Sequence, residues 1–213
     1  MKLGVFDSGI GGEAVAASLK LEFPNAEIVT ANDRGNVPYG SKPAELVKQL
    51  TDTAIQPLLS SGCDIIILAC NTATAVAIEF LRVKYPNQKF IGLEPMIKTA
   101  ASLTRSGTVA ICATPATLAS DRYAKLKNKF AGSTAILEPD CSSWAFMIEH
   151  NQINHGEIKS VINSVCEQNA DIIVLGCTHY HWIKELITKL AAGRAQVIDP
   201  SAAIAARVRE LLL

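Results

Sequence analysis

The stretch Asp64-Ile65-Ile66-Ile67-Leu68-Ala69-Cys70-Asn71-Thr72 recurs in kind at Asp171-Ile172-Ile173-Val174-Leu175-Gly176-Cys177-Thr178-His179. Each copy consists of an acidic residue, an apolar run rich in β-branched residues, a small residue, a cysteine and polar residues that open a helix-like segment. This pattern is typical of a buried parallel strand that carries a cysteine at its carboxyl end. We therefore expect two equivalent half-domains, and chemistry that uses one acid/base group on each face of a substrate.

Apolar runs of strand length alternate with amphipathic stretches of helix length along the chain. Such alternation predicts parallel sheets with helices on both faces. We expect an α/β fold of two pseudo-symmetric, doubly wound parallel-sheet lobes with the active site between them. The N-terminal lobe would comprise residues 1–94 plus 200–213, and the C-terminal lobe residues 95–199. The expected strands are Leu3–Phe6, Glu27–Thr30, Asp64–Leu68, Phe90–Leu93, Thr108–Cys112, Ala135–Leu137, Asp171–Leu175 and Gln196–Ile198; expected helices include Glu13–Leu21, Lys42–Leu59, Ala75–Lys84, Glu157–Gln168 and residues 201–213.

Composition excludes several classes of protein. The 213 residues are 49% hydrophobic and 19% charged, which is enough for a buried core. Lys+Arg and Asp+Glu number 20 each and form no basic cluster, so nucleic acid is not an expected partner. The sequence contains no secretory leader and no apolar run of membrane-spanning length, so we expect a cytoplasmic protein without membrane contact. In that compartment the six cysteines are expected as free thiols, with Cys63, Cys112 and Cys166 as ordinary buried residues.

Ligands of open α/β sheets bind beyond the carboxyl ends of the strands. There the turn Ser8-Gly9-Ile10-Gly11-Gly12 would let the backbone approach a small anion. The turn lacks the glycine spacing of a dinucleotide site and the lysine of a P-loop, so a nucleotide is not expected. Cys70 and Cys177 are each expected at a helix N-terminus, where the pKa of a thiol falls and backbone N–H groups bind an anion such as a carboxylate.

Asp7 and His179 are the residues that could take, give or orient protons beside the two sulfurs. An aspartate at a strand end is often only a helix cap, so both roles stay open for Asp7. His179 lies next to a candidate base, which favours a functional role. Glu149 would, from the pattern alone, be a solvated surface residue.

Four segments carry the most specific signal in the chain. They are Gly4-Val5-Phe6-Asp7-Ser8-Gly9-Ile10-Gly11-Gly12, Pro38-Tyr39-Gly40, Ala69-Cys70-Asn71-Thr72-Ala73 and Leu175-Gly176-Cys177-Thr178-His179-Tyr180. Together and in this order they resemble bacterial glutamate racemases of the aspartate/glutamate racemase superfamily. The chain departs from the usual pattern at Glu13, Asn36 and His181, where an apolar residue, a basic residue and a proline are common.

The resemblance implies inversion of glutamate without a cofactor or a metal: one cysteine thiolate removes the α-proton, and the other thiol protonates the opposite face. It makes Cys70 the base for D-glutamate and Cys177 the base for L-glutamate, with Asp7 and His179 assisting and Glu149 near the second thiol. It also implies a homodimer and a supply of D-glutamate for peptidoglycan. The matching substrate-contact positions are Asp7, Ser8, Pro38, Tyr39, Gly40, Cys70, Asn71, Thr72, Thr117, Cys177, Thr178 and His179.

Other functions are less favoured. Cys177, His179 and His181 with Cys70 could hold a metal, but the spacing is unusual for ligands, and a zinc-bound thiolate would be a poor base. A decarboxylase or isomerase of the same superfamily can dispense with one of the two thiols. Aspartate racemase is a closer alternative, although Cys177-Thr178-His179-Tyr180 resembles the glutamate branch. A carboxylate- or partner-binding protein that has kept the fold is the non-enzymatic alternative.

Overall fold

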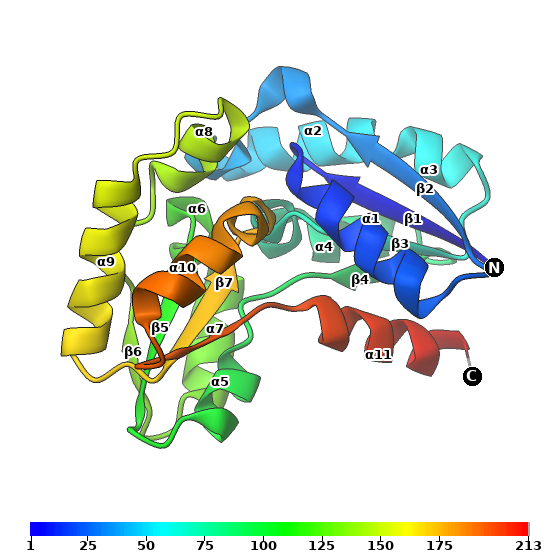
Figure 1. Ribbon diagram of the computed structural model, residues 1–213. Helices are drawn as coiled ribbons and strands as arrows, with labels where there is room; N and C mark the ends of the chain where they lie inside the picture. Colours follow the sequence, from blue (N-terminus) through cyan, green and yellow to red (C-terminus); the bar gives the residue numbers. More distant parts are fainter. Residues whose placement is uncertain (213) are drawn as a thin grey trace. The chain divides into compact units, whose positions relative to one another are not determined.

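The structure is a computed structural model that describes residues 1–212. The chain divides into two compact units, one formed by Met1–Glu94 with the segment from Pro200 onward, the other by Pro95–Asp199. Each unit contains one four-stranded parallel sheet, seen as arrows among helices in Figure 1. The expected α/β fold with two parallel sheets is confirmed.

The first unit has the strand order β2-β1-β3-β4. All of its strand pairs are parallel, and β3 is buried along its whole length because helices cover both faces of the sheet. The strands are β1 (Lys2–Asp7), β2 (Glu27–Asn32), β3 (Ile65–Leu68) and β4 (Lys89–Gly92). The helices are α1 (Gly11–Glu22), α2 (Ala44–Ala54), α3 (Gln56–Ser60), α4 (Asn71–Lys84) and α11 (Ser201–Leu212), with the 3-10 turns η1 (Arg34–Asn36) and η2 (Tyr39–Ser41).

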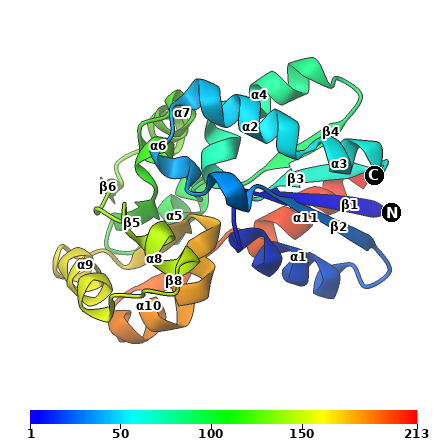
Figure 2. The same cartoon turned by 90° about the horizontal axis from the view of Figure 1, so that it is seen from above.

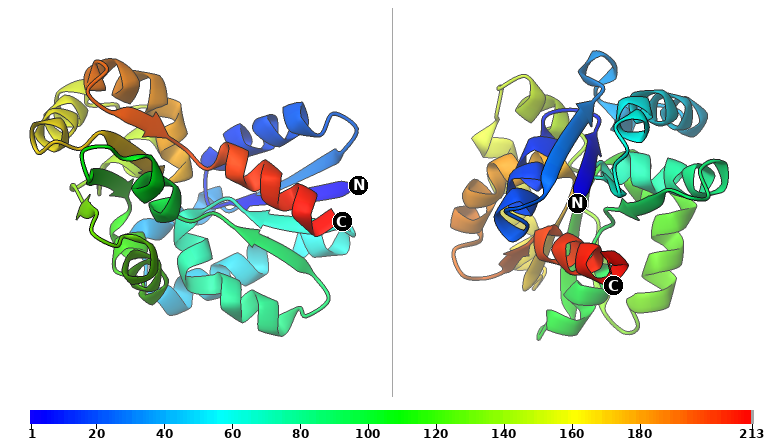
Figure 3. Two further views of the ribbon diagram at one scale, coloured as in Figure 1. Left: turned by 90° about the horizontal axis from the view of Figure 1, so that it is seen from below. Right: turned by 90° about the vertical axis from the view of Figure 1, so that its right-hand side faces the viewer.

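Two separate apolar clusters cover the faces of this sheet. Helices α1 and α11 bury Leu19 and Val208 against one face, which Figure 3 shows as two neighbouring helices. Helices α2, α3 and α4 bury Val47 and Leu81 against the other face, and Figure 2 shows α2 and α4 on the side opposite α1. Because strand side chains alternate between faces, Leu68 and Cys70 belong to the α2–α4 cluster.

The prediction of one helix over residues 42–59 is wrong in one respect, since this segment forms two helices, α2 and α3. Pro57 lies in the first turn of α3. A proline there has no N–H to lose, whereas inside a continuous helix its ring would clash with the preceding turn. The break therefore falls at Ile55, two residues before the proline.

The second unit repeats the arrangement of the first, with the strand order β6-β5-β7-β8 and parallel pairing throughout. Its strands are β5 (Thr108–Ala113), β6 (Ala135–Leu137), β7 (Ile172–Gly176) and β8 (Gln196–Ile198). Its helices are α5 (Ile97–Leu103), α6 (Pro115–Leu118), α7 (Asp121–Phe130), α8 (Trp144–Glu149), α9 (His155–Glu167) and α10 (Lys184–Ala191). No helix among residues 1–212 is long and apolar enough to span a bilayer.

The two units differ in the element that comes after the cysteine. Helix α4 begins at the residue after Cys70, whereas Cys177 is followed by the 3-10 helix η3 (Thr178–Ile183). Cys177 is thus at a helix N-terminus, as expected, but the helix is of the 3-10 type. The tighter turn, closed by a bond of 3.0 Å from the amide of Tyr180 to the carbonyl of Cys177, aligns Tyr180 and Ile183, and both side chains are buried.

Candidate active site

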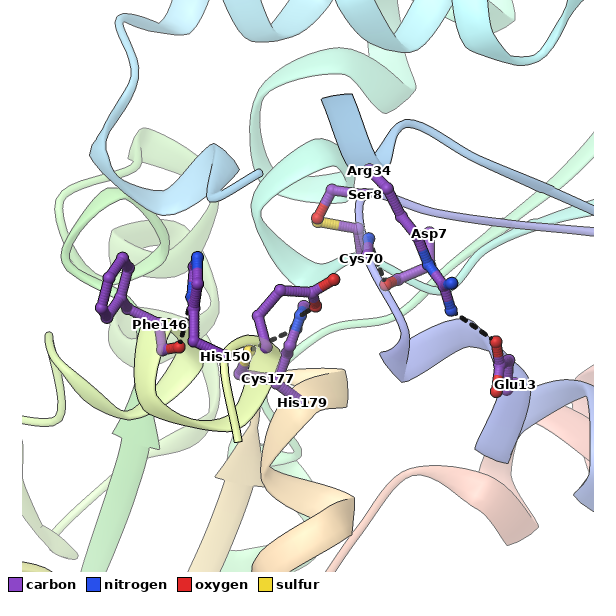
Figure 4. Close-up of polar contacts among 11 residues, drawn as sticks. Asp7, Ser8, Glu13, Arg34, Cys70, Phe146, His150, Cys177 and His179 are labelled. Carbon is purple, nitrogen blue, oxygen red and sulfur yellow. Dashed lines mark hydrogen bonds and ion pairs between the residues drawn. The ribbon is translucent and has the colours of Figure 1, made fainter. Parts of the chain in front are cut away.

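Strands β1 and β3 bring a hydroxyl and a thiol together in the first unit. Phe6 pairs with Leu68 across the two strands. Two residues further along each chain, Ser8 Oγ lies 3.5 Å from Cys70 Sγ, as Figure 4 shows. Both side chains are buried. The contact follows from the register, because residues two further along parallel strands return to the same face.

Cys70 caps the N-terminus of α4, and its sulfur accepts a bond of 3.4 Å from the amide of Ala73. Burial, and then the nearby Asp7 carboxylate, raise the pKa of Cys70 to about 11, while the bonds from Ser8 and Ala73 lower it. The lowering expected from the helix N-terminus is present but is outweighed. This thiol is therefore protonated at neutral pH in the structure.

Asp7 is a buried carboxylate beside this thiol. Its Oδ2 accepts a bond of 2.9 Å from the amide of Gly9. The N-cap of α1 is Ile10 and has no side-chain cap, so the helix-cap role that was open for Asp7 is not the one observed. Gly12 makes room for this arrangement, since a Cβ there would lie 2.6 Å from Cβ of Asp7.

The segment Pro38-Tyr39-Gly40 is held in the same unit by its tyrosine. The ring of Tyr39 is buried in the cluster that contains Cys70, with its centroid 6.4 Å from that of Phe6. Its hydroxyl donates to Oδ2 of Asp33 at 2.7 Å. Sequence reasoning did not single out Asp33, although the aspartate lies in the polar segment after β2 where ligand-binding residues are expected.

Asn71 has a buried side-chain amide with no partner among residues 1–212 for either its nitrogen or its oxygen. The side chain is only 4% exposed. Buried amides are nearly always satisfied, so an unsatisfied one beside a buried thiol indicates a place for a ligand. Thr72, the next residue of α4, is also buried.

The second thiol is the first member of a series of three side chains in contact, Cys177, His179 and Glu149. His179 Nδ1 lies 3.9 Å from Cys177 Sγ, and Figure 4 shows these two side chains next to each other. His179 Nε2 lies 2.7 Å from Glu149 Oε2. Cys177 and His179 are buried, and the Glu149 side chain is 13% exposed. The surface position that the sequence pattern alone gave Glu149 is therefore wrong, because α8 packs on η3 and places the carboxylate against the histidine.

The remaining residues of the second unit line the same strand ends. Thr117 is fully buried, and its Oγ1 lies 3.0 Å from that of Thr114. Thr178 is buried at the start of η3. Tyr180 donates to the carbonyl of Cys141 at 2.8 Å. A hydrogen bond with a neighbouring thiol and burial raise the pKa of Cys141, which keeps it protonated.

Within residues 1–212, no three His, Cys, Asp or Glu side chains gather in a group that could hold a metal ion. The first unit thus brings together Asp7, Ser8, Cys70, Asn71, Thr72 and the segment around Tyr39, and the second unit brings together Cys177, Thr178, His179 and Glu149. Each unit supplies one buried thiol with a proton-handling partner in contact with it.

Comparison with known proteins agrees with this chemistry. A family described as Asp/Glu/Hydantoin racemase matches residues 13–208. Glutamate racemase of Ectopseudomonas mendocina (strain ymp) is 36% identical over 99% of this chain and 81% of the relative. Glutamate racemase of Pseudomonas aeruginosa (strain UCBPP-PA14) is 35% identical with the same coverage.

Solved structures are similar over the same length. The Escherichia coli glutamate racemase in complex with L-glutamate and the activator UDP-MurNAc-ala has a TM-score of 0.89 and 28% identity, over 99% of this chain and 82% of that one. The Francisella tularensis glutamate racemase in complex with D-glutamate has a TM-score of 0.82 and 30% identity, over 99% and 80%. With identity above 30% over nearly its whole length, the chain belongs to the Asp/Glu/Hydantoin racemase family, among its glutamate racemases, and is an amino-acid racemase.

Proposed function

We propose that this chain interconverts L- and D-glutamate by a two-base mechanism in which Cys70 and Cys177 exchange the roles of base and acid. One observation carries the proposal: in each unit the third strand along the chain, β3 or β7, is followed within two residues by a buried cysteine that contacts a side chain able to give or take a proton. The mechanism requires both thiols to reach one α-carbon from opposite faces. It requires no pyridoxal phosphate.

Cys177 is the base for L-glutamate in this proposal. The Nε2–H of His179 donates to Glu149, which leaves Nδ1 free of a proton and facing the thiol. The thiol proton then moves to Nδ1, and the Glu149 carboxylate stabilises the imidazolium that results. The separation of 3.9 Å is long for this transfer, and such contacts tighten when substrate binds.

Cys70 is the acid in the same direction. Its raised pKa keeps the proton on sulfur, ready for delivery to the α-carbon. In the reverse direction Cys70 must first become a thiolate, which Ser8 and the amide of Ala73 stabilise. Asp7 is the nearby group that accepts or returns the proton in that direction.

The substrate's polar groups bind at the residues around the two thiols. The unsatisfied amide of Asn71 and the N-terminus of α4 fit an amino acid's carboxylate and ammonium groups. The further contact positions are Asp7, Ser8, Pro38, Tyr39, Gly40, Thr72, Thr117 and Thr178, as in the resemblance. The relatives solved with L- and D-glutamate support glutamate as the substrate.

The test is incubation of the purified protein with L-glutamate in D2O, without pyridoxal phosphate, followed by NMR of the α-proton. Loss of the signal together with formation of D-glutamate, and no exchange of L-aspartate, supports the proposal. Exchange of the α-proton of L-aspartate instead would show that the substrate is aspartate and not glutamate. Glutamate binding without exchange would leave a carboxylate-binding protein.

The cellular setting rests on the likeness to bacterial glutamate racemases. On that basis we extend the proposal to a cytoplasmic homodimer that supplies D-glutamate for peptidoglycan. Sedimentation analysis of the full chain tests the dimer. Rescue by this gene of a bacterium that depends on added D-glutamate tests the supply.

A further inference from the structure

We propose that Asp33 is a positioning residue that holds the segment Pro38-Tyr39-Gly40 in its substrate-binding conformation. The inference rests on the proposed function, which assigns this segment to substrate contact. Asp33 itself is not expected to touch the substrate. It acts through the hydroxyl of Tyr39.

Both oxygens of the Asp33 carboxylate are used inside its own loop. Oδ2 accepts from the Tyr39 hydroxyl at 2.7 Å, and Oδ1 accepts from the side-chain amide of Asn36 at 2.9 Å. The backbone is tied as well, because the amide of Asn36 donates to the carbonyl of Asp33 at 2.9 Å. Asn36, which replaces a residue that is commonly basic, thus gains a role as a clamp on Asp33.

Tyr39 links the Asp33 loop to the apolar core, and so holds its neighbours Pro38 and Gly40 in place. Tyr39 is 1% exposed and lies in the apolar cluster that includes Cys70. Burial and the bond to Asp33 raise the pKa of Tyr39, so its hydroxyl stays a proton donor to the carboxylate. A hydrogen bond to a charged acceptor is stronger than one between neutral groups, so this bond ties the loop firmly to the buried ring of Tyr39.

The same sheet offers a matched control at its opposite end. Tyr85 donates its hydroxyl to Asp52 at 2.8 Å. Its ring packs on Phe90 with centroids 6.4 Å apart, the same separation as between Tyr39 and Phe6. Each tyrosine therefore donates to an aspartate and packs on a phenylalanine, although the Tyr85 hydroxyl also accepts from Gln56 at 2.8 Å and Tyr85 is only half-buried. Tyr85 lies just before β4, at the amino end of the sheet and away from the cysteine.

The experiment compares Asp33→Ala and Tyr39→Phe with Asp52→Ala and Tyr85→Phe in the full chain. We expect the KM for glutamate to rise about tenfold in the first pair, with kcat within about twofold of wild type, because the lost order weakens ground state and transition state equally. The control pair keeps both constants within about twofold. Asp33→Asn retains an oxygen for the Tyr39 hydroxyl and restores most of the affinity. The double variant Asp33→Ala/Tyr39→Phe is expected to be no worse than Asp33→Ala alone, since both substitutions remove the bond between the Tyr39 hydroxyl and Asp33, and only Asp33→Ala also removes the bond to Asn36.

Equal changes of KM in both pairs would reduce Asp33 to a general stabiliser, and an unchanged KM in Asp33→Ala would overturn the proposal. If the proposed function itself is wrong, the wild-type protein will not turn over glutamate, and this result separates that failure from a failure of the positioning role. In that case hydrogen exchange decides: the amides of residues 39–42 should exchange about tenfold faster in Asp33→Ala and not in Asp52→Ala. Unaltered exchange would overturn the positioning role independently of activity.

Discussion

The two thiols occupy the same place in two sheets of the same strand order, yet the groups around them differ in kind. Cys70 contacts a hydroxyl and a backbone amide at the start of α4. Cys177 contacts a histidine that is itself bound to a carboxylate. The difference begins at the next residue, where the first unit continues into an α-helix and the second into η3.

This contrast shows that a repeated fold fixes the position of a reactive group but not its chemistry. An α-helix after the cysteine provides N–H groups for the sulfur, whereas the 3-10 turn after Cys177 directs the ring of His179 back toward the sulfur. The Cys70 thiol thus has a hydroxyl and a backbone amide in contact with it and the Asp7 carboxylate nearby, whereas the Cys177 thiol contacts a histidine bound to a carboxylate. Substitutions in each unit can test whether the two environments are also unequal in function.

Removal of either thiol is expected to have the largest effect. Cys70→Ala and Cys177→Ala should each lower kcat for racemisation by at least about 10³-fold, because each direction needs one base and one acid. On a glutamate analogue with a leaving group at the β-carbon, elimination needs only one base, so the two variants should process opposite enantiomers. Cys166→Ala, at a half-buried cysteine of the second unit, is the control that should behave as wild type. Equal activity of both variants on one enantiomer would contradict the paired roles.

Loss of the carboxylate behind His179 is expected next in size. Glu149→Gln should lower kcat/KM by about 10- to 100-fold, because the imidazolium that forms loses its counter-charge. The fall must be equal in both directions, since L- and D-glutamate have equal free energies in water. The α-deuterium isotope effect should nevertheless increase for L-glutamate alone, the substrate of Cys177.

Glu138→Gln is the matched control for that experiment. Glu138 accepts a bond from the Tyr123 hydroxyl at 2.7 Å and one from Lys127 at 2.6 Å in the same unit, apart from the series of side chains that begins at Cys177. Its kinetics should match wild type. An isotope effect that rises equally for both enantiomers of glutamate would argue against the assignment of Cys177 to L-glutamate.

The raised pKa of Cys70 gives a smaller, pH-dependent effect. With a pKa of about 11, the thiolate fraction of Cys70 rises about tenfold per pH unit up to about pH 10, where a free cysteine would already level off. Alkylation of Cys70 by iodoacetamide in the Cys177→Ala background, followed by peptide mass spectrometry, measures this slope. Ser8→Ala removes a bond that lowers the pKa of Cys70, so alkylation of Cys70 in that variant should be several-fold slower at each pH below about 10. A plateau near about pH 9 would contradict the shift.

The smallest effects are expected when a buried hydroxyl that only supports the structure is removed from each unit. Tyr180 donates to the carbonyl of Cys141, and Thr74 donates to the carbonyl of Leu68 at 3.0 Å. Tyr180→Phe and Thr74→Val each leave a buried carbonyl with one bond fewer, at a cost of about 1 kcal/mol in the free energy of unfolding. Urea denaturation measures both. A much larger loss in one unit would show that its strand ends are the less tolerant of the two.

The sequence was sufficient for the elements that depend on local pattern. Apolar runs of strand length placed the eight strands found within residues 1–212, and the repeated cysteine segments indicated that the two halves are alike. His179 was identifiable because it lies two residues from Cys177. Proline chemistry explains the one split helix, at Pro57, which a purely periodic reading of residues 42–59 overlooks.

Contacts between distant elements were not accessible in this way. Glu149 reaches His179 only because α8 packs on η3, and no periodicity in residues 144–149 encodes that packing. The resemblance to a family supplied the information that the pattern lacked. Asp33 was missed because its partner, Tyr39, is set by loop geometry, and a polar loop residue by itself gives no signal of a role.

Helix α11 has a consequence for how the protein is made. Its residues Ile204 and Val208 close the α1 side of the first sheet, whose strands all lie before residue 93. During translation the part of that face that α1 does not cover stays exposed while more than a hundred further residues are added, roughly 5–20 s at bacterial elongation rates. The part of the chain that is synthesised first is thus completed last, and its uncovered face is the surface on which a nascent-chain chaperone would act.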